Sequence, residues 1–142
     1  METPEKNSVT VQVTIDAPAK KVWEFWTEPE HITQWYHASD DWHAPYADND
    51  LRTDGKFKTT MAAKDGSFSF DFEGSYTNIQ TYKLIEYTLG DGRTVSISFD
   101  SDDNMTTITQ IFDAETVNPV EMQRTGWQAI LDNFKEYTES AV

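Results

Sequence analysis

Two periodicities in this sequence constrain its fold more than any other feature. Apolar and polar residues alternate with a period of two through much of the chain, beginning at 9–15, whereas a helical period marks two short segments after the first strand and the last part of the chain. Such alternation is typical of strands with one buried face. Asp65-Gly66 predicts a tight hairpin turn, and Gly74 interrupts an aromatic strand face at a bulge or sharp bend. The six predicted strands cover residues 9–15, 56–61, 68–76, 84–89, 94–100 and 106–113.

Helical spacing marks three further segments. Two short helices are predicted after the first strand, the first behind Pro18 and the second beginning at Pro29. A longer C-terminal helix is predicted from Asn118, with Pro119 in its first position and Glu121 completing a capping-box pattern. The apolar stripe of the long helix consists of Trp127, Ile130, Leu131, Phe134 and Tyr137 or Thr138.

These elements predict an α+β fold. An antiparallel sheet with one apolar face needs a cover, and the C-terminal helix is the only predicted element long enough to supply it. We expect a curved six-stranded antiparallel sheet wrapped around this helix, in one domain over residues 1–142 with an ordered core over 8–139. The chain holds 5 Trp, 6 Tyr and 8 Phe, and such bulky rings on both walls, together with Gly126 within the helix, would suit a cavity between sheet and helix.

The segment 37–54 shows neither period, and we predict a long structured loop there. It carries several aspartates together with Trp42, His43 and Arg52. Loops of this length within a compact domain are often functional. We therefore expect this segment to lie near the mouth of the cavity.

The charge and the cysteine count exclude several classes of function. The chain has 25 Asp plus Glu against 11 Lys plus Arg, a formal net charge of −14, and no Cys. This surplus repels phosphate backbones and anionic lipid, and Lys20-Lys21 is the longest basic run, so we predict no nucleic-acid or membrane partner. Without Cys there is no disulfide or thiol chemistry. Because no apolar run is long enough for a signal peptide or a membrane span, we predict a cytoplasmic protein.

Neither metal binding nor catalysis has a supporting motif. His31, His37 and His43 stand among carboxylates, but their six-residue intervals do not place them on one helix face. The segment 100–104 begins like a calcium loop, yet its later positions lack the required glycine and glutamate. No GxSxG elbow or phosphate-binding glycine pattern occurs. We predict no metal, no cofactor and no catalytic residue.

Binding of a small apolar molecule is the hypothesis that the residues favour. The aromatic strand face over 68–76 is most often simply core, but the same rings could line a cavity. Gln110 lies on the apolar side of its strand, where it could orient a ligand or satisfy a buried backbone group. Arg52 could contact a ligand, or could pair with Asp50 or Asp54. The predicted ligand-binding residues are Trp35, Trp42, His43, Arg52, Phe57, Met61, Phe70, Phe72, Tyr76, Gln110, Trp127 and Ile130.

The ordered set of motifs along 9–137 resembles a known family. It is similar to the START-like, helix-grip superfamily, in a bacterial subgroup of the branch related to the C-terminal domain of the activator of heat-shock protein 90 ATPase. The resemblance implies a curved sheet gripping a long C-terminal helix, and it brings no catalytic motif. The segments that carry it are ASDDWHAP from Ala38, NDLR from Asn49, KDGSFSFDFEGSY from Lys64, KLIEYT from Lys83 and NPVEMQRTGWQAILDNF from Asn118.

Three functions remain open at this point. The first is a non-enzymatic module that binds an apolar or lipid-like small molecule. The second, which the resemblance implies, is a stress-related partner of a chaperone, acting through its surface. The third is a cyclase or dehydratase on a polyketide-like substrate, in which His43 or Asp41 would take part. A free sheet edge beside the first strand could pair two copies, so we expect a monomer or a weak homodimer.

Overall fold

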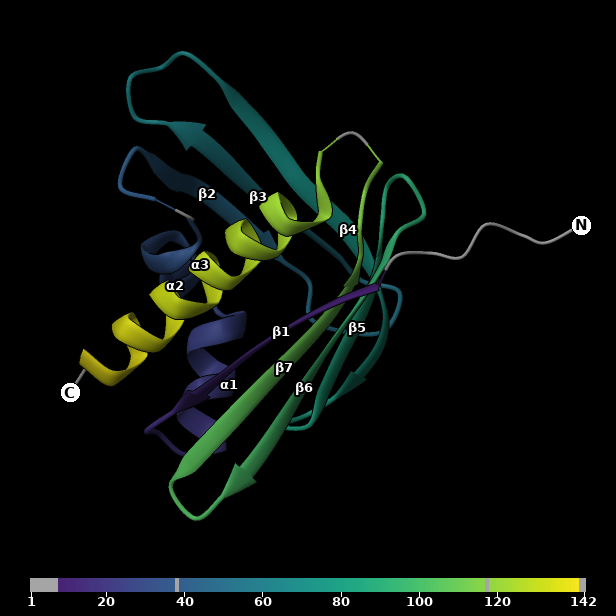
Figure 1. Ribbon diagram of the computed structural model, residues 1–142. Coiled ribbons are helices and arrows are strands. Elements are labelled where there is room, and N and C mark those ends of the chain that lie inside the picture. The colour runs from purple at the N-terminus through teal and green to yellow at the C-terminus, as the bar shows by residue number, and fades with distance from the viewer. Residues whose placement is uncertain (1–7, 38, 117, 141–142) are drawn as a thin grey trace, which may run out of the picture.

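The computed structural model describes residues 8–37, 39–116 and 118–140, arranged as one curved antiparallel sheet with three helices (Figure 1). The ends of the predicted domain, 1–7 and 141–142, lie outside the described residues, as do positions 38 and 117. The predicted α+β helix-grip class is confirmed. No described helix is long and apolar enough to cross a membrane. The elements are β1 (Ser8–Ile15), α1 (Ala19–Thr27), α2 (Pro29–Trp35), β2 (Trp42–Asn49), β3 (Lys56–Ala63), β4 (Ser69–Gln80), β5 (Leu84–Leu89), β6 (Thr94–Asp102), β7 (Met105–Asp113) and α3 (Val120–Ser140).

The described sheet has seven strands, one more than predicted. Their order is β1-β7-β6-β5-β4-β3-β2, and every neighbouring pair is antiparallel. The additional strand is β2, so the prediction of a loop over 37–54 is wrong there. β2 is an edge strand that pairs only with β3, and its register shifts between His43 and Tyr46. A strand that is buried irregularly and paired on one side shows no regular alternation in its sequence.

The free edge of β1 is covered by α3. Three α3 side chains donate hydrogen bonds to carbonyl oxygens along this edge, which an uncovered edge would offer to another chain. The edge that the sequence suggests for pairing two copies is therefore engaged within the chain. The bonds run from Arg124 to Thr10 (3.3 Å), from Gln128 to Gln12 (3.1 Å) and from Lys135 to Thr14 (2.8 Å).

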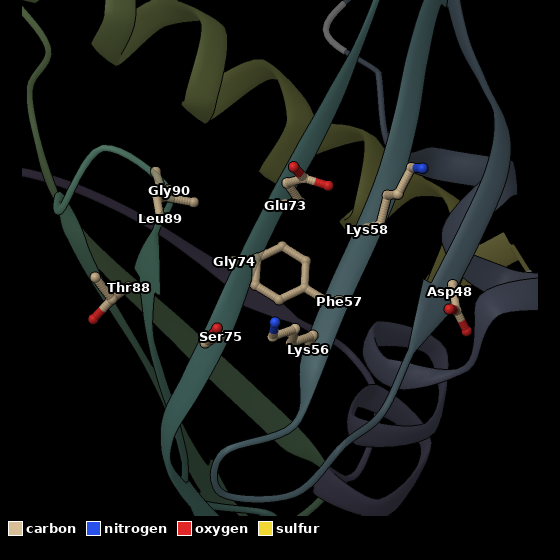
Figure 2. A pocket seen from close by; sticks show the side chains of 10 residues that line it. All are labelled: Asp48, Lys56, Phe57, Lys58, Glu73, Gly74, Ser75, Thr88, Leu89 and Gly90. Carbon is tan, nitrogen blue, oxygen red and sulfur yellow. The ribbon is translucent and has the colours of Figure 1, made fainter.

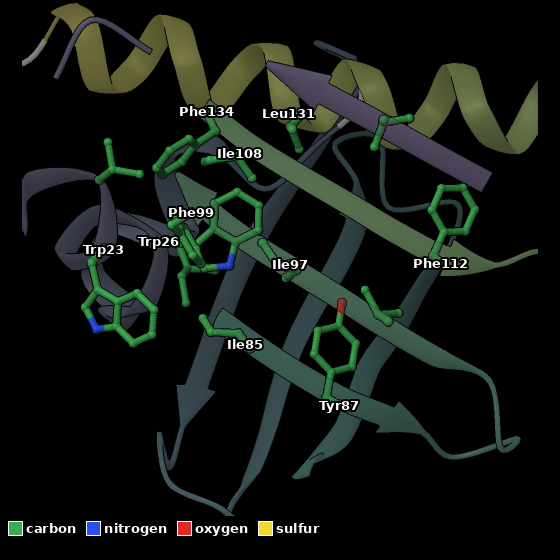
Figure 3. Close-up of a cluster of buried hydrophobic side chains, with 14 of the residues drawn as sticks. Trp23, Trp26, Ile85, Tyr87, Ile97, Phe99, Ile108, Phe112, Leu131 and Phe134 are labelled. Atoms are coloured by element: carbon green, nitrogen blue, oxygen red, sulfur yellow. The ribbon is translucent and has the colours of Figure 1, made fainter. Parts of the chain in front are cut away.

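The hydrophobic core lies between the sheet and the helices (Figure 3). The ring of Trp26 lies 4.9 Å, between centroids, from those of both Trp35 and Phe134. Trp35 is 1% exposed, and its Nε1 donates a hydrogen bond of 3.0 Å to the Phe25 carbonyl. The structure thus places Trp35, a predicted ligand-binding residue, in the core.

The start of α3 is held differently from the predicted capping box. The helix begins at Val120, and the side chain of Gln123 turns back to the preceding segment. Gln123 accepts a hydrogen bond from the Glu115 N–H (2.9 Å) and donates to the carbonyls of Glu115 (3.1 Å) and Asn118 (2.8 Å). Glu121 takes no part in these bonds and pairs with an arginine one turn along the helix. Gln123 therefore anchors the chain where it enters α3.

Gly74 lies where β4 passes very close to the neighbouring strands β3 and β5. A Cβ at this position would lie 2.6 Å from the Thr88 carbonyl oxygen and 3.0 Å from the Phe57 ring. Phe57 is the cross-strand partner of Gly74, and its ring uses the space that the glycine leaves. The predicted irregularity in β4 comes shortly afterwards, between Tyr76 and Asn78. Gly74 is thus required by a close approach of backbone and ring.

Candidate ligand-binding site

A cavity of about 380 Å³ lies between the β3–β4 hairpin and the first half of α3. We call it the helix-side cavity. Its volume falls within the range of small-molecule sites, roughly 300–1,000 Å³. Five residues that the sequence predicts as ligand-binding come together in its lining, namely Met61, Phe70, Phe72, Trp127 and Ile130. The other lining residues are Tyr36, Arg93, Glu115, Asn118, Gln123 and Gly126.

The strand wall of the helix-side cavity follows from the alternation in the sequence. Met61 pairs with Phe70 across the strands, and Thr59 pairs with Phe72. Side chains two residues apart on a strand point to the same face, so positions 61, 70 and 72 share the inner face of the sheet. The Phe72 ring meets the Trp127 ring edge-on, at 6.0 Å between centroids. This contact joins the strand wall to the helix wall.

The helix wall contains one fixed ring and one gap. Trp127 stacks on Phe112 of β7, with the ring centroids 3.9 Å apart and the planes 8° from parallel. The stack holds this part of α3 at a set distance from β7. A Cβ built on Gly126 would meet no heavy atom within 4 Å. The residue next to the stacked tryptophan therefore leaves free volume in the cavity wall.

Polar groups gather at the rim of the helix-side cavity. The Arg93 Nε donates to the Asp91 carboxylate at 2.7 Å. Glu115 and Gln123 bond to each other's polar groups at the start of α3. Because these rim groups already have partners within the chain, they shape the entrance without leaving an unpaired charge in an apolar wall.

A smaller cavity of about 40 Å³ lies deeper in the molecule, and we call it the inner cavity. Its volume is close to that of one water molecule, roughly 30 Å³. Phe57 and Tyr76, both predicted as ligand-binding, line it, and Tyr36 lines both this cavity and the helix-side cavity. The remaining lining residues are Trp26, Ile32, Asp48, Asn49, Thr59, Ile85, Tyr87 and Ile97.

Three tyrosines meet around the inner cavity. Burial raises the pKa of Tyr36, Tyr76 and Tyr87, and proximity to Tyr36 raises the pKa of the other two further. The Tyr76 hydroxyl donates a hydrogen bond to Asn49 Oδ1. A hydrogen bond with the Gln110 side chain acts in the opposite direction, lowering the pKa of Tyr87. All three phenols are therefore neutral near pH 7, and neutral phenols donate hydrogen bonds.

The outer face of the sheet carries a third hollow, of about 580 Å³, which we call the outer groove (Figure 2). The Phe57 ring lies between β3 and Gly74 of β4 in this view. The strand residues around it are mostly polar or charged: Lys58 is the cross-strand partner of Glu73, and Lys56 is that of Ser75. The outer groove is larger than the helix-side cavity, but its lining holds one aromatic ring, that of Phe57, whereas four rings line the helix-side cavity.

An exposed cluster of rings stands near the tip of the β3–β4 hairpin. Phe68 is 59% exposed and Phe70 is 41% exposed. Trp42 of β2 lies 6.0 Å from each of these rings, between centroids. We call Trp42, Phe68 and Phe70 the aromatic tip. The tip is continuous with the helix-side cavity through Phe70.

The remaining predicted residues lie away from both interior cavities. Arg52 pairs with Asp50 at 2.9 Å, which is one of the alternatives that the sequence leaves open. His43 is half-buried on β2 and pairs across the strands with Ala62. Gln110 is 4% exposed, and its partner is the Tyr87 side chain. None of Arg52, His43 and Gln110 lines the helix-side cavity or the inner cavity.

One group of possible metal ligands occurs within the described residues. Glu28, Glu30 and His31 hold ligand atoms within 4.8 Å of one another. The His31 Nδ1 lies 2.7 Å from the Tyr137 hydroxyl, and its Nε2 lies 3.6 Å from Glu28. The histidine is thus already engaged with protein groups at both ring nitrogens. The group joins α2 to α3.

Sequence reasoning missed several residues of the cavity walls. Tyr87 shares the inner face of β5 with Ile85, and the alternation over 84–89 could have indicated it. Gly126, by contrast, is a wall residue that the sequence already indicates, because it has no side chain beside Trp127. Tyr36 carried no such signal, because only the packing of α2 against the sheet brings it between two cavities.

The fold and the helix-side cavity define a helix-grip protein with a pocket between sheet and helix. Residues 16–139 match the family described as Activator of Hsp90 ATPase homolog 1-like protein, and the chain belongs to this family. The resemblance that the sequence motifs indicate is therefore confirmed. No match was found among curated proteins.

Solved bacterial structures give the same fold. The AHSA1-like protein from Aeromonas hydrophila is 39% identical, with a TM-score of 0.89 over 95% of this chain and 94% of that chain. Protein Chr148 from Cytophaga hutchinsonii is 55% identical, with a TM-score of 0.81 over 93% and 92% of the two chains. Protein NE0264 from Nitrosomonas europaea is 21% identical, with a TM-score of 0.83 over 99% and 100%, and at this identity it shows the fold alone.

Proposed function

We propose that this protein is a non-enzymatic binding module that holds an apolar small molecule in the helix-side cavity. One observation carries the proposal: residues from β3 and β4 converge with residues from α3 on a cavity of about 380 Å³. The space is open to solvent on one side, so a ligand can enter it. Concave sites lined largely by apolar and aromatic side chains are typical of small-molecule binding.

The size and the chemistry of the cavity narrow the ligand. The volume lies near the lower end of the range for small-molecule sites. Aromatic rings form much of the wall, and rings pack favourably against other rings in edge-on or offset geometry. These features favour a compact ring compound over a long acyl chain.

Gly126→Leu tests the proposal. The added side chain enters free space in the cavity wall, and leucine has a higher helix propensity than glycine, so the variant should fold. A ligand that binds only the native state raises the melting temperature. We expect compounds from a hydrophobic library to raise the melting temperature of the wild type and to have little effect on Gly126→Leu.

Gly90→Leu is the matched control. Gly90 also has open space around an added Cβ, but it lines the outer groove. This variant should keep the ligand-induced shift. A shift that survives in Gly126→Leu but disappears in Gly90→Leu would move the site to the outer groove. The absence of any shift across a broad library would contradict the proposal.

A second candidate function, a chaperone partner, is favoured by the aromatic tip. Phe68 and Phe70 are exposed rings at the end of a projecting hairpin, and exposed aromatic residues often anchor protein interfaces. The family description names activation of an Hsp90 ATPase. Under this hypothesis the tip would contact the chaperone.

The partner hypothesis is tested by stimulation of a bacterial heat-shock protein 90 ATPase. Phe68→Ser should abolish stimulation, whereas Met122→Ser, a change at a residue 63% exposed on α3, should leave it intact. A lack of stimulation by the wild type at stoichiometric excess would eliminate this function.

A further inference from the structure

The side chain of Tyr36 divides the two interior cavities. Tyr36 is the residue at which α2 ends, and it lines both the helix-side cavity and the inner cavity. Its ring lies 6.0 Å from that of Phe72, a wall residue of the helix-side cavity, and 5.0 Å from that of Trp35 in the core. A ligand that fills the helix-side cavity therefore meets Tyr36 at its buried end.

The hydroxyl of Tyr36 differs from the two hydroxyls beside it. Tyr76 bonds to Asn49, and Tyr87 bonds to Gln110. Among the described residues, the Tyr36 hydroxyl makes no hydrogen bond. Tyr36 is half-buried and lines both cavities, so its hydroxyl can be reached from the space that the residue lines. This phenol is therefore a hydrogen-bond donor available to a ligand.

The charges near Tyr36 select the kind of ligand group. Asp48 lines the inner cavity, and it would repel an anion held there. Arg93 lines the helix-side cavity, but its guanidinium is paired with Asp91 at 2.7 Å. A carboxylate at Tyr36 would thus lose its hydration beside a cation whose charge Asp91 already offsets. A neutral oxygen can accept the phenol proton without this cost.

We propose that Tyr36 determines the specificity of the helix-side cavity, by donating a hydrogen bond to a neutral carbonyl or ether oxygen at the buried end of a ring-containing ligand. The apolar body of the ligand then packs against the touching rings of Phe72 and Trp127, which line the same cavity. This inference rests on the proposed function, and it adds the polar group by which the ligand is recognised.

The experiment compares two probes of nearly equal shape, 2-acetylnaphthalene and 2-ethylnaphthalene. Only the first carries a carbonyl oxygen. A neutral hydrogen bond contributes enough for roughly a 3- to 10-fold difference in Kd. We expect the wild type to bind the ketone more tightly by this factor. Tyr36→Phe should weaken ketone binding by the same factor and leave the Kd of the hydrocarbon unchanged.

Tyr46→Phe is the control, because Tyr46 is 51% exposed on β2 and lines neither interior cavity. It should bind both probes as the wild type does. Tyr36→Phe removes a hydroxyl that has no bond to a described residue, so its melting temperature should equal or exceed that of the wild type. A loss of folding in this variant would show that the hydroxyl has a structural partner, and it would overturn the inference.

The remaining outcomes separate the inference from the proposed function. Equal binding of both probes, or an unchanged preference in Tyr36→Phe, would overturn the role of Tyr36 while leaving the cavity as a binding site. Tighter binding of 2-naphthoic acid than of the ketone would also overturn it, since Arg93 would then be the recognition group. Failure of the wild type to bind either naphthalene, together with no hit in the library, would overturn the proposed function itself.

Discussion

The two halves of the sheet have similar alternating sequences, but α3 packs closely against one half and is separated from the other. In the half formed by β1, β7 and β6, most alternate residues are buried, and α3 covers the free edge. In the half formed by β4, β3 and β2, the aromatic tip is exposed and the helix-side cavity lies between the strands and α3. The same residue pattern thus gives a core where the helix lies close and a pocket where it does not.

Particular residues account for the difference between the halves. The stacked rings of Trp127 and Phe112 set the distance between α3 and β7. Gly126, one residue earlier, adds no side chain to the space beyond the stack. On the sheet, Gly74 allows β4 to pass close to Phe57 as the hairpin leaves the packed region. The open half therefore results from a few particular aromatic residues and glycines, in a fold whose other half is closely packed.

The largest expected effect compares one phenylalanine from each half. Phe134 is 0% exposed and contacts Trp26 and Trp35, so Phe134→Ala should lower the free energy of unfolding by about 3–5 kcal/mol. Phe70→Ala removes a ring that is 41% exposed, and it should cost less than about 1 kcal/mol. Urea denaturation measures both. Equal losses would break the distinction between a closed and an open half.

A smaller effect is expected from Tyr87, which lies on β5 between the two halves. Burial raises its pKa in the folded state, so above the ordinary value near 10 the unfolded chain ionises while the folded protein keeps the proton. The stabilising contribution is complete below pH 10 and is lost as the pH rises further. At pH 11 the loss is on the order of 1 kcal/mol.

Tyr87→Phe should remove this part of the alkaline destabilisation. The free energy of unfolding, measured by urea titration at pH 8 and pH 11, should fall less in the variant than in the wild type. Tyr46→Phe, at an exposed position, serves as the control. An identical pH dependence in Tyr87→Phe and the wild type would mean that Tyr87 is accessible to solvent, and the boundary of the open half would then move to β5.

The smallest expected effect compares two glycines. Gly126→Ala should raise the free energy of unfolding by about 0.5–1 kcal/mol, because alanine favours the helix and its Cβ enters open space. Gly74→Ala should lower it, because the Cβ would lie 2.6 Å from the Thr88 carbonyl oxygen. Thermal denaturation measures the difference. A destabilised Gly126→Ala would show that the cavity wall is closed at this point.

Much of the fold and part of the site could be predicted from the sequence. Alternation placed Met61, Phe70 and Phe72 on one face, and helical spacing placed Trp127 and Ile130 on the facing helix, because both patterns are local. β2 could not be predicted, since an irregular edge strand has no regular pattern to read. Arg52 was a ligand candidate from its position in the chain, and its pairing with Asp50 depends on the fold of that turn.

The sequence by itself determined which faces of the strands and helices are apolar, and hence that one sheet must close on one long helix. Only the tertiary structure decided where that closure is complete. The separation of α3 from β3 and β4 depends on the stack of Trp127 on Phe112, and the position of Tyr36 depends on how α2 packs. Whether a face is apolar depends on residues that are close together in the sequence. The size of a cavity depends on the distance between elements that are far apart in the chain, and only their packing sets that distance.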